Sequence, residues 1–134
     1  MRKVKYIAIH CTGASQQQSV NSILRYWEKT LGWRNPGYHR LIEADGTVHK
    51  LAPFEGITNG VRGFNSECIH IAYIGGEHGD NRTEEQKAAI LDCIFEAMEW
   101  IGDKPIIQGH RDFPNVAKSC PSFDAKKEYE WIII

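Results

Sequence analysis

The chain has 134 residues, with 16 basic and 17 acidic side chains and a formal net charge of -1. This length predicts one domain, residues 1–134, that buries roughly two-thirds of the surface exposed by its unfolded form. The balanced charge argues against a nucleic-acid partner, and the absence of a long apolar run argues against membrane insertion. We therefore expect a single domain that acts on a neutral substrate.

The first predicted element is a β-strand over residues 3–11, which are rich in Val, Ile and Tyr and should be buried on both faces. His10 lies near the end of this strand, where functional sites form in α/β proteins. Because side chains alternate along a strand, Cys11 should point away from the face that carries His10. Cys11 is therefore a poor candidate for a ligand that works beside His10.

A helix is predicted from about Val20 to Thr30, with Ser19 as its N-cap. Its apolar residues recur at helical spacing and form one stripe, which should pack on the core. The stripe consists of Val20, Ile23, Leu24 and Trp27.

Two short strands, 38–42 and 47–51, should form a hairpin around the tight turn at Asp45-Gly46. Alternation along the first of these strands places Tyr38 and Arg40 on one face. A long loop is expected to follow, because the next residues contain several glycines and prolines.

The second half of the chain begins with a predicted strand at 68–74 and a helix at about 84–101. Thr83 and Gln86 form a capping box that marks where this helix begins. Its stripe of Ile90, Leu91, Ile94, Phe95, Met98 and Ile101 should pack on the sheet.

A short strand at 104–108 and a final helix after Asp124, carrying Tyr129 and Trp131, complete the predicted elements. Strands and helices alternate without internal repeats. The fold class is therefore α/β, a single domain with a central mixed β-sheet of about five strands flanked by about three helices.

The stretch beginning at Gly109-His110-Arg111-Asp112 suggests metal chemistry. His110 and Cys120 stand ten residues apart in what should be an irregular loop, and imidazole and thiolate are ligands that zinc selects. His10 is the best third candidate, since it and His110 both emerge from the ends of predicted strands. Two His and one Cys leave one position of a tetrahedral zinc open, which is typical of a catalytic site. These residues predict a zinc hydrolase.

The chain has four cysteines, and none of them form a Cys-x-x-Cys pair. This spacing excludes a zinc ribbon and argues against a small disulfide scaffold. Cys68 and Cys93 are expected to be free, buried and apolar in character, whereas Cys120 lies in a loop where packing does not explain a thiol.

Several short motifs occur along the chain in a fixed order. They are His10-Cys11-Thr12, Gly32-Trp33, Gly37-Tyr38-His39, Asp45-Gly46-Thr47-Val48, Gly109-His110-Arg111-Asp112 and Lys118-Ser119-Cys120-Pro121. This pattern, over about residues 6–124, resembles the type-2 N-acetylmuramoyl-L-alanine amidases, a family that includes bacteriophage amidase-type lysozymes and peptidoglycan recognition proteins.

The resemblance implies one zinc ion per chain, held by His10, His110 and Cys120. It also implies hydrolysis of the amide between N-acetylmuramic acid and L-alanine in peptidoglycan, with Tyr38 and Lys118 assisting. We expect Lys118 to stabilise the oxyanion and Tyr38 to position the water or shuttle its proton, although the two roles could be exchanged. Without the resemblance, Tyr38 would be interpreted as a packing aromatic and Lys118 as a solvated charge.

The chain departs from this family at two positions. Many relatives carry a His in the loop before the third strand, where this chain has Gly60. His70 stands in the next strand, where a Gly is usual. We expect His70 to be a core residue, or to support a ligand without binding the metal itself. The loss of a His at position 60 would affect rate and specificity more than the metal.

Three other functions remain open from the sequence. The chain could be a non-catalytic or weakly catalytic peptidoglycan-binding module, a zinc enzyme acting on another amide, or a protein whose His and Cys residues are structural. The presence of Cys120 favours the enzyme, because binding-only relatives typically lack this residue.

We expect a monomer. The location of action is left open: the N-terminus lacks the features of a signal peptide, which suits a phage or prophage lysin or a released effector.

Overall fold

The computed structural model describes residues 2–133, so residues 1 and 134 of the predicted domain lie outside the described part. It contains one five-stranded sheet, α-helices and short π- and 3-10-helical turns. In chain order these are β1 (Tyr6–Cys11), α1 (Val20–Arg25), η1 (Tyr26–Thr30), β2 (Arg40–Ile42), β3 (Val48–Lys50), η2 (Asn65–Glu67), β4 (Cys68–Tyr73), α2 (Glu84–Ile101), β5 (Ile106–Gly109), η3 (His110–Asp112), α3 (Ala125–Glu128) and α4 (Glu130–Ile133). The predicted α/β fold with a mixed sheet is confirmed.

The strands lie in the order β3-β2-β4-β1-β5. Only the β2–β3 hairpin is antiparallel; β2, β4, β1 and β5 run parallel to one another. Consequently these four strands end at one edge of the sheet, and the segments that follow β1 and β5 begin side by side. His10 and His110 reach the same place because each lies at the end of one of these strands.

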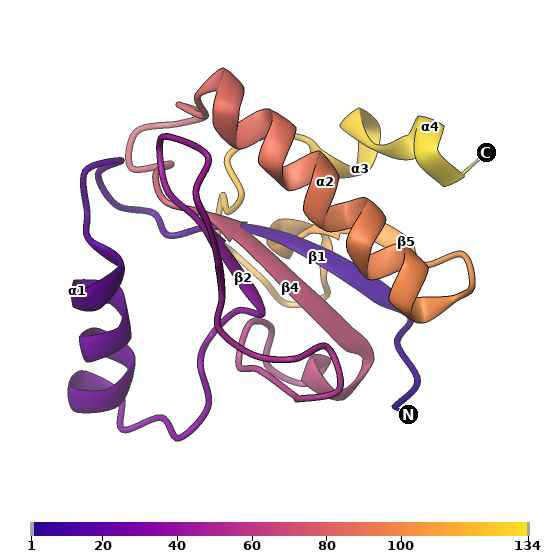
Figure 1. Ribbon diagram of the computed structural model, residues 1–134, viewed down its shortest axis with the longest axis horizontal. Helices are drawn as coiled ribbons and strands as arrows, with labels where there is room; N and C mark the ends of the chain where they lie inside the picture. Colours follow the sequence, from indigo (N-terminus) through magenta and orange to yellow (C-terminus); the bar gives the residue numbers. More distant parts are fainter. Residues whose placement is uncertain (1, 134) are drawn as a thin grey trace.

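The long helix α2 covers one face of the sheet and buries the main core (Figure 1). Both halves of the Thr83–Gln86 capping box are formed, and Gly102 ends the helix with a left-handed φ of 72°. The buried side of α2 consists of Gln86, Ala89, Ile90, Cys93, Ile94 and Ala97. Phe95 was wrongly assigned to this side: it is 45% exposed and contacts Trp131 at the surface.

The first helix packs on the opposite face of the sheet, where Ile23 and Trp27 meet Leu41 in a second, smaller core (Figure 1). Ser19 caps the helix as predicted. Its second half is a π-helical turn, η1, which the apolar spacing did not indicate. The Trp27 and Trp33 rings stack there, with their centroids 6.3 Å apart.

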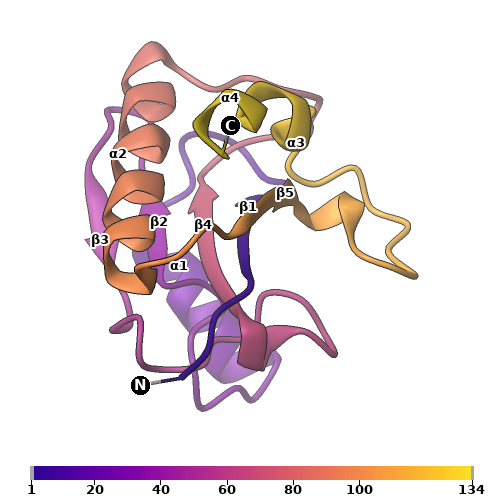
Figure 2. The same ribbon diagram turned by 90° about the vertical axis from the view of Figure 1, so that its right-hand side faces the viewer.

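Two further boundaries differ from the predictions. The stretch at His110–Asp112 is a 3-10 helix rather than an irregular loop, and the residues after it project beside β5 (Figure 2). The final helix consists of two short segments, α3 and α4, that are separated at Tyr129. Among residues 2–133, no helix combines the length and hydrophobicity needed to cross a membrane.

Candidate metal centre

Three side chains from distant parts of the chain meet at the edge where β1 and β5 end. They are His10, His110 and Cys120, and their ligand atoms all lie within 4.8 Å of one another. Nδ1 of His10 lies 3.9 Å from Sγ of Cys120. The structure thus brings together the three residues that were predicted from the sequence as metal ligands.

The spacing suits a zinc ion. With zinc bonds of about 2.3 Å to sulfur and about 2.0–2.1 Å to nitrogen, a tetrahedral centre sets these two ligand types about 3.6 Å apart. The observed 3.9 Å between His10 Nδ1 and Cys120 Sγ needs only a small adjustment. The Cys11 side chain belongs to the main core, as alternation along β1 predicts, and although this residue also borders the pocket it is outside the candidate ligand group. The donor set is therefore two imidazoles and one thiol, which leaves a fourth position for water or substrate.

Burial keeps both imidazoles in the form that binds metals. His10 is 1% exposed, and desolvation, with smaller effects of His70, His110 and Lys118, lowers its pKa well below the usual value. His110 is partly buried, and desolvation together with Lys118 lowers its pKa to about 4. Both rings are thus neutral near pH 7, with a lone pair available for a metal.

Local contacts fix the position of Cys120. The Cys11 backbone N–H donates to its Sγ at 3.2 Å, and the Arg111 N–H donates to its carbonyl oxygen at 2.9 Å. Gly109 allows this approach, since a β-carbon there would lie 2.5 Å from Cδ of Pro121. The contact between the two cysteine side chains lowers the pKa of Cys11 to about 6 and raises that of Cys120. Metal binding at Cys120 would therefore displace a proton.

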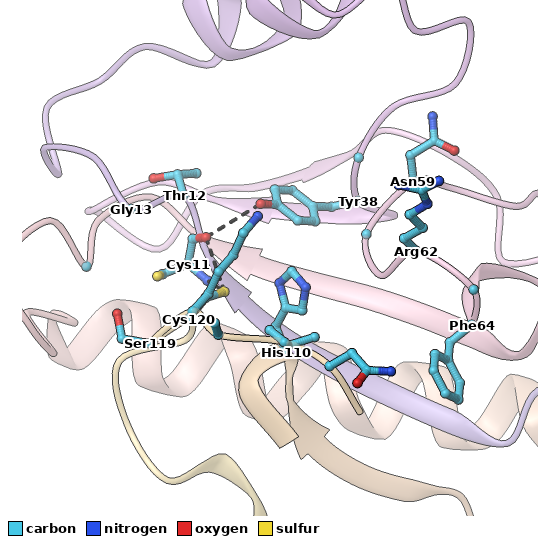
Figure 3. A pocket seen from close by; sticks show the side chains of 18 of the residues that line it. Cys11, Thr12, Gly13, Tyr38, Asn59, Arg62, Phe64, His110, Ser119 and Cys120 are labelled. Carbon is cyan, nitrogen blue, oxygen red and sulfur yellow. Dashed lines mark hydrogen bonds between the residues drawn. The ribbon is translucent and has the colours of Figure 1, made fainter. Parts of the chain in front are cut away.

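A pocket of about 860 Å³ opens over this centre (Figure 3). His110 and Cys120 lie at its base, and Tyr38 and Lys118 also line it. Its remaining walls include Trp27, Trp33, the 59–64 loop and residues 114–117. The two proposed catalytic residues thus share one cavity with two of the candidate ligands.

Tyr38 lies beside the metal centre. Its ring centroid is 4.9 Å from that of His10, and its hydroxyl lies 3.5 Å from the Cys11 carbonyl oxygen (Figure 3). Desolvation raises the pKa of Tyr38, so the phenol keeps its proton.

The expectation that Tyr38 and Arg40 share a face was wrong. Tyr38 precedes β2, whereas Arg40 points toward α2 and pairs with Glu96 at 3.0 Å.

His70 is fully buried directly behind His10 and is outside the candidate ligand group. Its Nδ1 lies 2.9 Å from Nε2 of His10. A β-carbon at Gly60 would lie 2.3 Å from the same Nδ1. Positions 60 and 70, where we expect the chain to depart from the family pattern, are therefore linked, because the His70 ring fills the space that a side chain at position 60 would need.

The sequence patterns missed other groups at this site. Asn59 and Arg62 line the pocket, and Asn65 hydrogen-bonds to His70. The sequence offered little indication of these residues, because polar side chains and a cationic side chain in a glycine-rich loop are common on protein surfaces. Only the fold places that loop across from Lys118.

Comparisons with known proteins show which family the sequence and the fold resemble. Residues 1–123 match the family described as N-acetylmuramoyl-L-alanine amidase. The endolysin of Klebsiella phage KP32 is 31% identical over 96% of this chain and 87% of its own length. Peptidoglycan-recognition protein SC2 of Drosophila melanogaster is 25% identical over 88% of this chain and 68% of its own. Among solved structures, the Ph2119 endolysin from a Thermus scotoductus bacteriophage superposes with a TM-score of 0.82 at 27% identity, covering 91% of this chain and 79% of that one.

Proposed function

Because this chain belongs to the N-acetylmuramoyl-L-alanine amidase family, we propose that it hydrolyses the amide joining N-acetylmuramic acid to L-alanine in peptidoglycan. We propose that one zinc ion per chain, bound by His10, His110 and Cys120, is required. The observation that carries this proposal is the convergence of those three donors beneath a pocket. We further propose that residues 1–134 form one catalytic domain that works as a monomer.

The residues fit the roles that this reaction needs. When bound, zinc supplies Lewis acidity that polarises the scissile carbonyl and lowers the pKa of a water toward about 7. The neutral rings of His10 and His110 contribute lone pairs, and Cys120 contributes a negative charge after losing its proton. We infer that the pocket over these residues receives the substrate and holds the scissile carbonyl near the ligands.

Lys118 and Tyr38 act on the charge and the proton of the reaction. Attack of water on the carbonyl carbon places negative charge on the carbonyl oxygen, and the Lys118 ammonium stabilises it. The C–N bond then breaks, and the L-alanine amine leaves with a proton that came from the attacking water. The lactyl group stays on the sugar as a carboxylate. The Tyr38 hydroxyl, which keeps its own proton, orients the attacking water through its oxygen or passes the proton along.

Purified peptidoglycan provides the test. Zinc-loaded protein is incubated with it, a chelated sample serves as the control, and the products are identified by mass spectrometry. The proposal expects free stem peptides with a new L-alanine amine only in the zinc-loaded sample. Intact glycan–peptide links in both samples would contradict it. Zinc-dependent cleavage of a different amide would support a zinc hydrolase but contradict the proposed substrate bond.

A second candidate is a peptidoglycan-binding module without catalysis. The observation that favours it is the similarity to peptidoglycan-recognition protein SC2 over 88% of this chain. The presence of the Cys120 thiol 3.9 Å from His10 Nδ1 supports the enzyme instead. Sedimentation with insoluble peptidoglycan separates the two: a binding module would stay with the pellet without releasing peptides, with or without zinc.

A further inference from the structure

A series of hydrogen bonds runs behind the metal centre and ends at His10. The Val61 backbone N–H donates to Oδ1 of Asn65 at 2.7 Å, and Nε2 of His70 lies 2.9 Å from the same oxygen. Nδ1 of His70 then lies 2.9 Å from Nε2 of His10. Both imidazoles are buried, so water has little access to either ring.

The direction of every bond in this series follows from its first member. A backbone N–H can only donate, so the Asn65 atom facing Val61 is its carbonyl oxygen, which can only accept. Nε2 of His70 must therefore carry the proton. A neutral imidazole has one N–H, so Nδ1 of His70 is an acceptor, and Nε2 of His10 must be the donor that faces it.

This direction determines which nitrogen of His10 is available. With its proton on Nε2, His10 has its lone pair on Nδ1, the atom that lies 3.9 Å from Cys120 Sγ. The alternative tautomer would turn an N–H toward the ligand group and leave two lone pairs facing each other between His10 and His70. A metal ion cannot bind a nitrogen that carries a proton.

We propose that His70 is a positioning residue that holds His10 in the Nε2–H tautomer and so presents Nδ1 to the metal. The inference rests on the proposed metal-dependent function, and it names a residue that does not contact the metal or the pocket. Asn65 fixes the tautomer of His70 in the same way, by accepting its Nε2 proton.

The surroundings of His70 hold its ring in this position. Its backbone N–H donates to Nδ1 of His39 at 3.0 Å, and the two rings stack at 6.0 Å with an interplanar angle of 17°. On another side Gly60 has no side chain, and a β-carbon there would lie 2.3 Å from His70 Nδ1. Gly60 therefore helps to position His70, because it leaves room for the imidazole ring.

Two variants of similar shape test the hydrogen bond. His70→Asn provides a side-chain oxygen close to where Nδ1 stood, whereas His70→Leu fills similar space without an acceptor. Zinc affinity is measured by competition with a chromophoric chelator, and thermal melting of the metal-free proteins checks that each variant folds. We expect His70→Leu to weaken zinc binding about 10- to 100-fold, the usual range for residues that orient a ligand, and His70→Asn to restore most of the affinity.

The tautomer is read directly from the metal-free wild-type protein by nitrogen NMR of its histidine rings. A proton on Nε2 and a bare Nδ1 at His10 are expected, and a proton on Nδ1 would overturn the proposal. Equal zinc affinity of folded His70→Leu and wild-type protein would also overturn it. If His70→Leu does not fold, Gly60→Ala replaces it: by displacing the His70 ring, it should weaken zinc binding, and unchanged affinity would count against the proposal.

These measurements do not depend on turnover. A wild-type protein that binds zinc through this tautomer but releases no peptide would remove the proposed amidase activity and leave the role of His70 intact. An active amidase whose His10 carries its proton on Nδ1 in the metal-free state would keep the proposed amidase activity and remove the proposed role of His70.

Discussion

Gly60 and His70 are sterically coupled, because a β-carbon at position 60 would lie 2.3 Å from Nδ1 of His70. The two residues are ten positions apart, on a loop and on β4, and both are positions at which we expect the chain to depart from the family pattern. A side chain at position 60 therefore cannot be accommodated unless the His70 ring moves or is removed.

Gly60→His should therefore destabilise the protein. Forcing a large side chain against the buried His70 ring should lower the free energy of unfolding by about 1–3 kcal/mol, as is usual for overpacking. Urea denaturation of the metal-free protein measures this change. Most of the loss should disappear when Gly60→His is combined with His70→Gly, which removes the obstructing ring. Additive effects of the two substitutions would show that the positions are independent.

Cys120→Ser should abolish zinc-dependent peptide release and greatly reduce zinc affinity, because a serine hydroxyl is a poor zinc ligand beside two imidazoles. Isothermal titration with zinc and the peptidoglycan assay measure the two effects. Cys93→Ala is the matched control, since Cys93 lies on the buried side of α2 in the main core and is outside the candidate ligand group. A Cys120→Ser protein that kept full activity would remove Cys120 from the ligand set.

Tyr38→Phe should reduce turnover roughly 100-fold or more, since the phenol that orients water or carries a proton is lost. The ring remains, so its packing against His10 and Trp27 should persist, and zinc affinity should change little. Tyr26→Phe is the control, because Tyr26 is 52% exposed on η1. Comparable losses in both variants would mean that the Tyr38 hydroxyl has no special role.

Lys118→Gln should lower turnover about 100-fold or more by removing the cation that we propose stabilises the developing oxyanion. The side chain is exposed at the rim of the pocket, so the stability of the fold should be unaffected. Lys118→Arg should retain part of the rate, and Lys126→Gln, an exposed lysine on α3, serves as the control. A large fall in zinc affinity with Lys118→Gln would point to a different role for this lysine.

The ion pairs of Arg82 should make stability depend on pH. Its guanidinium lies 2.9 Å from Asp80 and 2.8 Å from Glu128, and these contacts lower the pKa of both carboxyl groups. A carboxyl group with a lowered folded-state pKa adds stability above its unfolded pKa of about 4, and this stability is lost as the pH falls through the folded value. Wild-type protein should therefore lose stability in acid.

Glu128→Gln isolates this contribution. The variant should be less stable than wild type near pH 7, and the difference between the two should shrink as the pH falls below about 4. Urea titrations with chelator at several pH values measure this difference. Groups away from Arg82 should titrate alike in both proteins, whereas Asp80 shares the Arg82 guanidinium with Glu128 and is part of the same contribution. A difference that stays constant with pH would show that the loss came from packing.

Local patterns in the sequence determined much of the framework. The capping box and apolar stripe located α2 at Glu84–Ile101, and the N-cap Ser19 located the start of α1, because these signals involve residues within one or two helical turns. The three candidate ligands were also identifiable. Two of them stand at the ends of parallel strands, and zinc prefers the residue types involved.

The tertiary structure alone decided how these parts meet. The Tyr38 ring lies beside His10 at a position just before β2, and Phe95 is exposed because α2 turns other residues of its apolar stripe toward the sheet. The hydrogen bond between His10 and His70 joins residues 60 positions apart. No local pattern encodes such a contact, since it exists only after β1 and β4 pair and their side chains share one buried face. For the same reason, the steric link between Gly60 and His70 appears only when the loop has closed over the sheet.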